Sequence, residues 1–255
     1  MLESLRTWPL LQGYRGRTGV DIDKLIEILI RFSYLVADHP KLGEFDIIPL
    51  LVSPTGTIAL DARAMISPGR RVGKGAYPHL AISPYPEQHI TPAKTTDGRK
   101  LILRPIKPED EPMWLDMLNS CSEDSIRMRF FSLISDFTHE MAVRYCMCDY
   151  DRELAMVAEI EHEGVRKLVG VCRLVADPDH HTAEFAVIIP DAWQGRGIGR
   201  SLTDVCLGIA KGWGIRRSSA ETLPQNDRMI AIFKVRKFKI ELNDARDTII
   251  AFKKL

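Results

Sequence analysis

A stretch rich in proline and glycine interrupts this chain and limits how its two sides can fold. Five prolines and four glycines lie within residues 67–98, and no hydrophobic periodicity runs through them. Proline fixes φ, lacks a backbone N–H donor and ends helices, so a continuous helix or central strand cannot cross this stretch. We therefore predict an interdomain linker over residues 67–98, between a small domain over residues 1–66 and a larger one over residues 99–255.

The composition is that of a globular protein, with 45% hydrophobic and 27% charged residues and a formal net charge of +1. A dedicated nucleic-acid-binding domain is usually strongly basic, so we expect no nucleic-acid partner. No apolar run reaches the roughly 18 to 20 residues of a membrane span, and polar residues interrupt the N-terminal apolar stretch, so we expect neither a membrane segment nor a signal peptide. The five cysteines are scattered without a CxxC motif, which is typical of reduced thiols in the cytoplasm.

The first domain has the pattern of a small α/β unit. Apolar residues at three- and four-residue spacing predict a helix over residues 19–39, which Asp21 or Asp23 can cap. Strands are predicted over residues 45–52 and 57–60, with a turn over residues 53–56 between them.

The second domain alternates strand and helix signals, and is long enough at about 155 residues to bury its own core. The predicted strands cover residues 100–103, 154–160, 167–174, 183–189, 218–222 and 248–252, and the predicted helices cover residues 108–118, 197–211 and 227–237. Three consecutive strands with a hairpin-like turn at residues 177–181 favour a mostly antiparallel sheet flanked by helices, an α+β arrangement.

A glycine-rich turn between a strand and a helix carries the strongest functional signal. Gly195, Gly197 and Gly199 let the backbone approach a ligand closely, and consecutive N–H groups at a helix N-terminus attract an anion. Arg196 and Arg200 add positive charge, so a pyrophosphate is the natural ligand. The glycine interval does not fit the dinucleotide fingerprint GxGxxG.

The pattern Gln194-x-x-Gly197-x-Gly199 resembles the pyrophosphate-binding turn of the GNAT N-acetyltransferase superfamily. The segment that starts at Asn226 resembles the closing helix of that superfamily, in which the Asn contacts the CoA arm; Phe233 occupies the position of a Tyr that often serves as general acid. The resemblance implies acetyl-CoA as cosubstrate and a GNAT fold, with water or the departing thiolate in place of the Tyr. The implied cofactor-binding residues are Val187, Ile188, Ile189, Gln194, Gly195, Arg196, Gly197, Ile198, Gly199, Arg200, Asn226 and Phe233.

Further segments resemble a narrower group, the bacterial protein-lysine acetyltransferases in which a GNAT domain is joined to an ADP-forming acyl-CoA synthetase-like region. Residues 129–132, 139–141 and 149–153 resemble the acetyltransferase part, and residues 1–66 resemble the end of an ATP-grasp domain. In the metal-binding motif of that domain Ile48 replaces an Asn, and an apolar side chain cannot bind a hard cation. We therefore interpret residues 1–66 as an ATP-grasp remnant without ATP chemistry.

Glu184 is the predicted general base. It is the only charged residue in the run over residues 183–189, and it matches the catalytic glutamate of the group. A lysine side chain has a pKa of about 10.4 and a glutamate about 4.3, so the base should be desolvated and linked to the amine through water. A backbone N–H at the end of this strand, within residues 187–189, should stabilise the thioester oxyanion.

Two rival chemistries are less favoured by the sequence. A cysteine acyl-enzyme would need Cys172 or Cys206, which lie on apolar faces and are predicted core residues. His180 and His181 lie in a polar turn, so we expect no metal site.

The function predicted from the sequence is acetyl-CoA-dependent transfer of an acetyl group to the ε-amine of protein lysines. The expected partner is a protein with a reactive lysine, which includes the possibility of an acyl-CoA synthetase. Two alternatives stay open: a GNAT enzyme that acetylates a small amine, and a non-catalytic acyl-CoA sensor.

Overall fold

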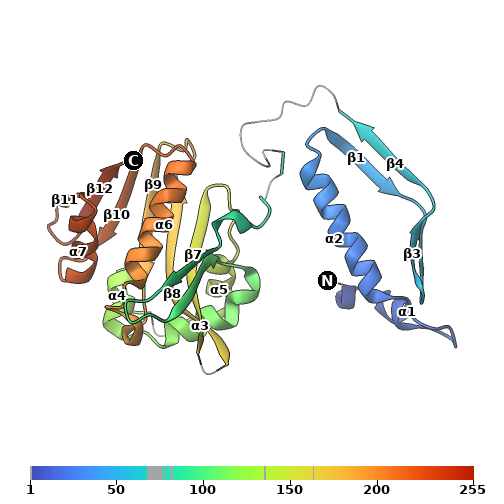
Figure 1. Cartoon of the computed structure of the whole chain (residues 1–255), viewed down its shortest axis with the longest axis horizontal. Coiled ribbons are helices and arrows are strands. Elements are labelled where there is room, and N and C mark those ends of the chain that lie inside the picture. Colours follow the sequence, from blue (N-terminus) through green and yellow to red (C-terminus); the bar gives the residue numbers. More distant parts are fainter. Residues whose placement is uncertain (1, 68–76, 78, 81–82, 135, 163) are drawn as a thin grey trace. The chain divides into compact units, whose positions relative to one another are not determined.

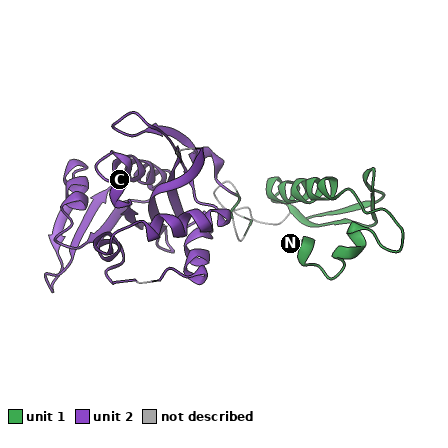
Figure 2. Cartoon of the chain, turned by 90° about the horizontal axis from the view of Figure 1, so that it is seen from below, with its two compact units in different colours: residues 1–84 green, residues 85–255 purple. Residues whose placement is uncertain are grey.

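The computed structural model describes residues 2–67, 77, 79–80, 83–134, 136–162 and 164–255 of the chain. Residues 1–84 and residues 85–255 form two separate units (Figure 2). Part of the predicted linker, residues 68–76, 78 and 81–82, lies outside the described residues. Within the described ranges, no helix is long and apolar enough to cross a membrane.

The first unit contains one long helix and two small antiparallel sheets. Its elements are a 3-10 turn (Leu2–Ser4), α1 (Trp8–Gln12), α2 (Ile22–Asp38), β1 (Leu42–Ile47), β2 (Leu50–Ser53), β3 (Gly56–Ala59) and β4 (Ala62–Ile66). Strand β1 pairs with β4, and β2 pairs with β3 in a hairpin. Asp21 caps α2, because its carboxylate accepts a hydrogen bond of 3.0 Å from the N–H of Lys24. The predicted helix, its cap and the turn at residues 53–56 are confirmed.

This unit has very little core of its own. Among its described residues only Leu25 and Ala37 are buried apolar side chains, whereas Ile48 is 73% exposed and Ile58 60% exposed. Every residue of β4 is exposed. Such apolar exposure on a helix and on strands is what a piece of a larger domain shows.

The second unit is built on one eight-stranded sheet (Figure 1). Its strands are β5 (Thr91–Lys94), β6 (Lys100–Pro105), β7 (Glu153–His162), β8 (Val165–Ala176), β9 (Thr182–Ile188), β10 (Arg217–Thr222), β11 (Lys239–Leu242) and β12 (Ile249–Lys254). Its helices are α3 (Glu111–Asn119), α4 (Glu123–Phe130), α5 (His139–Cys146), α6 (Ile198–Gly212) and α7 (Asp227–Val235). Short 3-10 turns cover Glu87–His89, Pro108–Asp110 and Asp191–Trp193.

The sheet has the order β11-β12-β10-β9-β8-β7-β6-β5. Every neighbouring pair is antiparallel except β9 and β10, which are parallel and joined by the crossover helix α6. Apolar residues of α6 and α7 bury one face of the sheet, and those of α3, α4 and α5 bury part of the other. The predicted α+β architecture with a mixed, mostly antiparallel sheet is therefore confirmed.

A buried ion-pair network ties β6 to the start of the first helix of this unit. Arg104 donates to both carboxylate oxygens of Asp110, at 2.6 and 2.7 Å, and to Glu159 on β7, at 2.6 and 2.8 Å. All three residues are at most 9% exposed. A buried guanidinium is tolerated here because both carboxylates satisfy it.

Several elements differ from the prediction. Strand β5 lies inside the predicted linker and pairs with β6, so the linker prediction is wrong over residues 85–98. The single strand predicted over residues 45–52 is two strands with different partners. Helices α4 and α5 and the short strands β4 and β11 were not predicted, because short polar segments carry a weak periodic signal.

Candidate active site

Strands β9 and β10 separate after three residue pairs, and this separation creates the site. Their pairing runs from Thr182↔Arg217 to Glu184↔Ser219 and stops there. Strand β9 continues to Ile188, so the edge of β9 that faces β10 has no partner strand over residues 185–188 among the described residues. A strand edge of this kind offers backbone donors and acceptors to an extended ligand.

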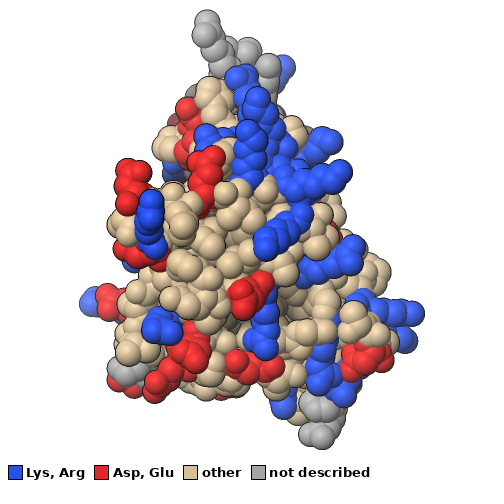
Figure 3. Space-filling model, turned by 90° about the vertical axis from the view of Figure 1, so that its left-hand side faces the viewer, with Lys and Arg blue, Asp and Glu red and all other residues tan. Residues whose placement is uncertain are grey.

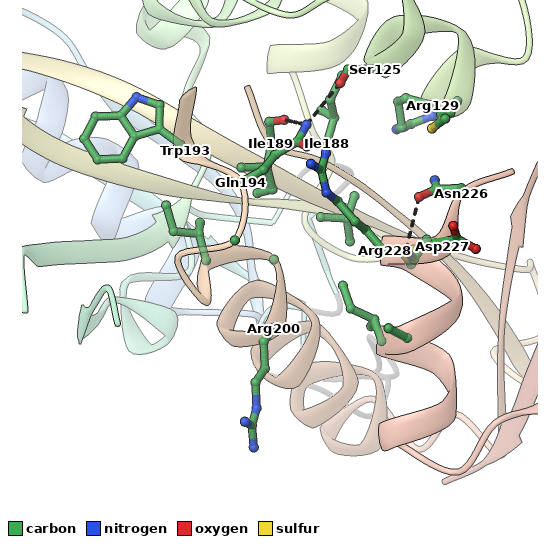
Figure 4. A pocket seen from close by; sticks show the side chains of 18 of the residues that line it. Ser125, Arg129, Ile188, Ile189, Trp193, Gln194, Arg200, Asn226, Asp227 and Arg228 are labelled. Carbon is green, nitrogen blue, oxygen red and sulfur yellow. Dashed lines mark hydrogen bonds between the residues drawn. The ribbon is translucent and has the colours of Figure 1, made fainter. Parts of the chain in front are cut away.

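A pocket of about 670 Å³ opens beside this edge (Figure 4). It is lined by the end of β9 and the residue that follows it, by the turn before α6 and the start of α6, by α4, and by the first turns of α7. The predicted residues that line it are Val187, Ile188, Ile189, Gln194, Gly195, Gly197, Ile198, Gly199, Arg200 and Asn226. The structure thus brings together segments from residue 125 to residue 232.

The turn before α6 presents free backbone donors to this pocket. Gly195 and Gly197 have φ angles of +72° and +83°, a left-handed conformation that favours glycine. No hydrogen bond leaves the N–H groups of residues 195 and 197–200 within the described chain; the first one at this helix start runs from Ser201 to the carbonyl of Gly197, at 3.0 Å. Free N–H groups that converge at a helix N-terminus form an anion site.

Gln194 holds the turn in place. Its side-chain amide donates to the carbonyl oxygen of Ile189, at 2.8 Å, and to the hydroxyl of Ser125 on α4, at 3.0 Å (Figure 4). Its Oε1 atom is buried and has no partner among the described residues. The Gln194 side-chain nitrogen therefore links the residue after β9, the turn and α4. Its side-chain oxygen can accept a further hydrogen bond.

The hairpin between β5 and β6 supports the same turn from the other side. The N–H of Thr96 donates to the carbonyl oxygen of Arg196, at 3.0 Å, and Asp97 forms an ion pair of 2.8 Å with the Arg196 guanidinium. Arg196 also lies over the ring of Trp193. Residues that sequence reasoning had placed in the linker thus hold the glycine-rich turn.

The two predicted arginines of the turn do not both serve the pocket. The Arg196 side chain is paired with Asp97 and is not among the pocket-lining residues, so its predicted contact with the ligand stays a prediction. Arg200 lines the pocket, but its side chain is directed away from Gln194 in Figure 4. A different arginine, Arg228, directs its positive charge into the pocket.

Arg228 supplies such a charge, and sequence reasoning missed it. It lies on the first turn of α7, is exposed, and has no hydrogen bond or ion pair in the described part of the chain. Figure 4 shows its side chain extending across the pocket toward Gln194. The one sequence signal that could have identified Arg228 as a pocket residue was its position two residues after the predicted Asn226. Lys and Arg also gather in the upper part of the face seen in Figure 3.

Asn226 and Phe233 have structural roles. The Asn226 side chain caps α7 by accepting from the N–H of Met229, at 3.1 Å, and it donates to Thr222, at 2.9 Å, so both ends of the amide are engaged. Phe233 is fully buried and packs against Phe185 and Phe238. Phe233 is not among the pocket-lining residues, and its phenyl ring is part of the core, so its predicted contact with the cofactor stays a prediction.

Glu184 lies on β9 where the two strands begin to separate. It is exposed, and the register places it on the same sheet face as Ser219, its pair on β10, and Glu221, two residues further. Partial burial and the negative charge of Glu221 raise the pKa of Glu184, whereas Arg129 on α4 acts in the opposite direction. A carboxylate with a raised pKa beside a pocket is suited to accept a proton.

The cysteines and histidines that the sequence analysis considered lie in the core and in a polar turn. Cys172 and Cys206 are fully buried in the core, as predicted, and burial raises the pKa of the Cys206 thiol. Asp177 and Asp179 accept hydrogen bonds from the backbone N–H of His181, which is ordinary turn geometry. In the described ranges, no group of three or more His, Cys, Asp or Glu side chains could hold a metal ion.

Comparisons with known proteins match both units. The sequence model of the Acetyltransferase (GNAT) family matches residues 114–238, and that of an ATP-grasp domain matches residues 1–66. An acetyltransferase of Pseudomonas aeruginosa, PA5475, is 28% identical over 121 residues, which are 48% of this chain and 65% of that protein. The ADP-forming acetate–CoA ligase I of Archaeoglobus fulgidus is 33% identical over 66 residues, 26% of this chain and 10% of the ligase.

The fold of the second unit also has solved relatives. The crystal structure of the GNAT domain of S. lividans PAT superposes with a TM-score of 0.61 and 24% sequence identity, over 67% of this chain and 99% of that domain. The chain thus spans about two thirds of the Pseudomonas acetyltransferase and only a tenth of the ligase.

Proposed function

Because the second unit is a GNAT-family acetyltransferase domain and the first is an ATP-grasp fragment, we propose that the chain transfers acetyl groups from acetyl-CoA to lysine side chains of proteins. One observation carries the acetyl-CoA assignment. The free N–H groups of the turn at residues 195–200 and the unpaired edge of β9 open into one pocket. A pyrophosphate suits the turn, and an extended amide-containing arm suits the strand edge.

The proposed mechanism is direct transfer with Glu184 as general base. The turn holds the phosphates, and the strand edge aligns the thioester, whose developing oxyanion accepts a hydrogen bond from a backbone N–H of β9. Glu184 takes the proton of the attacking amine through water, which its raised pKa favours. Since Phe233 is buried and carries no hydroxyl, the departing thiolate is protonated by water.

The exposure of Glu184, the proposed base, favours protein substrates. Glu184 and Glu221 are exposed on a sheet face, so a side chain presented by another protein has access to them. The likeness of residues 1–66 to ADP-forming acyl-CoA ligases supports an acyl-CoA synthetase as the candidate acceptor protein.

The proposal is tested by measuring release of free CoA with a thiol-reactive dye, with acetyl-CoA as donor. We expect release to depend on lysine-containing peptides or an acyl-CoA synthetase, and mass spectrometry to locate the acetyl group on lysine. Release with polyamines or amino acids alone would replace the protein substrate by a small amine. Tight acetyl-CoA binding without release for any amine would overturn the enzymatic proposal in favour of a sensor.

Replacing Glu221 by Gln should shift the acid limb of the pH profile of kcat/KM to lower pH. The base must be ionised, so activity rises with pH through the pKa of Glu184. The charge of Glu221 raises that pKa, and its removal therefore lets Glu184 ionise at lower pH. The matched control is Glu241→Gln on β11, an exposed carboxylate that is not among the groups acting on Glu184. An unchanged limb in Glu221→Gln would contradict the assignment of Glu184 as base.

Replacing Arg228 by Gln should raise the KM for acetyl-CoA about two- to fivefold, because an exposed charge contact contributes up to about 1 kcal/mol. The effect should shrink as salt is added, since screening weakens exposed charge pairs. Lys234→Gln removes a charge from the same helix away from the pocket and serves as the control. Equal effects of the two variants on KM would rule out a specific contact.

A further inference from the structure

Arg129 is a cation at the pocket for which the described residues provide no hydrogen-bond or ion-pair partner. It lies in the last turn of α4, lines the pocket and is partly buried. Its guanidinium makes no hydrogen bond or ion pair within the described ranges, and it lies 4.9 Å from the ring centroid of Phe130. Tyr145 and Glu184 favour its charge through space but do not offset the effect of burial. Burial lowers the pKa of Arg129, which means that its surroundings disfavour the charge it carries.

Other buried arginines of this unit are all compensated. Arg104 is held by two carboxylates, Arg236 by Asp204 at 2.7 Å, and Arg173 by Glu153 and two backbone carbonyls. Arg173 is also a like-charged neighbour of Arg129 and disfavours its charge further. A partly buried guanidinium without a counter-ion destabilises the folded protein. A bound anion would offset this cost, so Arg129 is a candidate anion-binding residue.

The location of Arg129 identifies which part of the pocket that anion would occupy. One turn earlier on α4, Ser125 accepts a hydrogen bond from Gln194 and so contacts the phosphate-binding turn. Arg129 follows Ser125 by one turn of α4, and the charges of Arg129 and Glu184 act on each other. We therefore place Arg129 on the side of the proposed base, beyond the residue that contacts the glycine-rich turn.

We propose that Arg129 binds a carboxylate brought to the reacting centre by a substrate. This inference rests on the proposed acyltransferase function and extends it to substrate choice. The carboxylate can come from the acyl group of a dicarboxylic acyl-CoA such as succinyl-CoA, or from an acidic residue beside the acceptor lysine. Arginine suits either source because its planar fork pairs with a carboxylate through two hydrogen bonds.

The reaction balances for a carboxylate-bearing donor as it does for acetyl-CoA. The amine nitrogen forms an amide bond to the thioester carbon, and the carbon–sulfur bond breaks. The nitrogen proton passes through water to Glu184, and the thiolate leaves and takes a proton from water. The distal carboxylate stays ionised and paired with Arg129 throughout.

The first arm of the test compares donors that differ in this carboxylate. We would measure kcat/KM for succinyl-CoA and for butyryl-CoA, an uncharged donor of similar chain length, in wild type, Arg129→Gln and Arg129→Lys. A charged hydrogen bond contributes about 1.5–3 kcal/mol, so wild type should prefer succinyl-CoA about 10- to 100-fold. Arg129→Gln should abolish the preference, and Arg129→Lys should retain part of it.

The second arm keeps acetyl-CoA as donor and compares lysine peptides with Glu or Gln beside the lysine. Arg127→Gln is the matched control for both arms, because Arg127 lies on the same helix, pairs with Asp124 and does not line the pocket. A preference in either arm that disappears only in Arg129→Gln supports the proposal. The first arm then assigns the carboxylate to the donor, and the second assigns it to the acceptor.

Two results would overturn the proposal: no preference in either arm, or a preference that survives in Arg129→Gln. An equal loss for all donors and peptides in that variant would show that Arg129 only supports the fold or orients Glu184. Equilibrium Kd values for succinyl-CoA and butyryl-CoA distinguish failure of the Arg129 proposal from failure of the proposed acyltransferase function. They report carboxylate recognition even if no acyl transfer occurs.

Discussion

Replacing Glu184 by Gln should lower kcat/KM for lysine acetylation by roughly 10²- to 10⁴-fold, the range that a positioned general base contributes. The amide has nearly the shape of the carboxylate but cannot accept the proton of the attacking amine. Binding of acetyl-CoA should be unchanged, because Glu184 is not among the residues that line the pocket. Isothermal titration with acetyl-CoA and steady-state CoA release measure the two quantities separately.

The Glu184→Gln variant should fold normally, and the pH profile of its kcat/KM should lack the acid limb. Glu184 is exposed on β9, and substitution of an exposed residue usually changes the free energy of unfolding by no more than about 0.5 kcal/mol. Residual activity should no longer rise with pH through the raised pKa of the glutamate. Activity within threefold of wild type, with the pH profile intact, would exclude Glu184 as the base.

Replacing Gly197 by Ala should weaken acetyl-CoA binding at least about tenfold. Gly197 has a φ of +83°, and a Cβ placed there would lie 3.2 Å from the Cγ2 atom of Thr96. The Thr96 side chain can relieve the contact by a small shift, but relief of the backbone strain at a positive φ requires the turn to rotate its N–H groups. Each hydrogen bond to a charged phosphate contributes about 1.5–3 kcal/mol, so even one lost donor accounts for a tenfold change.

Gly214→Ala separates this loss from general destabilisation. Gly214 also has a positive φ, +79°, but nothing lies within 4 Å of a Cβ placed there, and it is not among the pocket-lining residues. Both variants should lose about 1–2 kcal/mol of stability, the usual cost of a left-handed alanine. Only Gly197→Ala should lose acetyl-CoA affinity in a titration. Similar affinities for the two variants would disprove the role of the turn.

The glycine-rich turn was predictable because its signals are local. Gln194, Gly197 and Gly199 lie close together in sequence, and a strand-to-helix turn follows from residues on either side. The positive φ angles of Gly195 and Gly197 agree with the reason for which glycine was assigned there. The same local logic correctly predicted Asp21 as the cap of α2.

Contacts across the sheet were not predictable in the same way. The role of residues 91–97 depends on pairing between β5 and β6 and on the ion pair of Asp97 with Arg196, about one hundred positions later in the chain. Arg129 and Arg228 come to one pocket from two helices on either side of β9 and β10. Phe233 was assigned to the cofactor by analogy, and only its packing against Phe185 shows that it belongs to the core.

The sequence by itself determined the α+β class, the two-part organisation and the position of the glycine-rich turn, because periodicity and turn chemistry act over a few residues. The tertiary structure decided where β9 and β10 separate, which arginines keep an uncompensated charge, and that Glu184 has Glu221 and Arg129 as electrostatic neighbours. These properties depend on distances between segments far apart in the chain. They are set by strand pairing and side-chain packing, which no local pattern encodes.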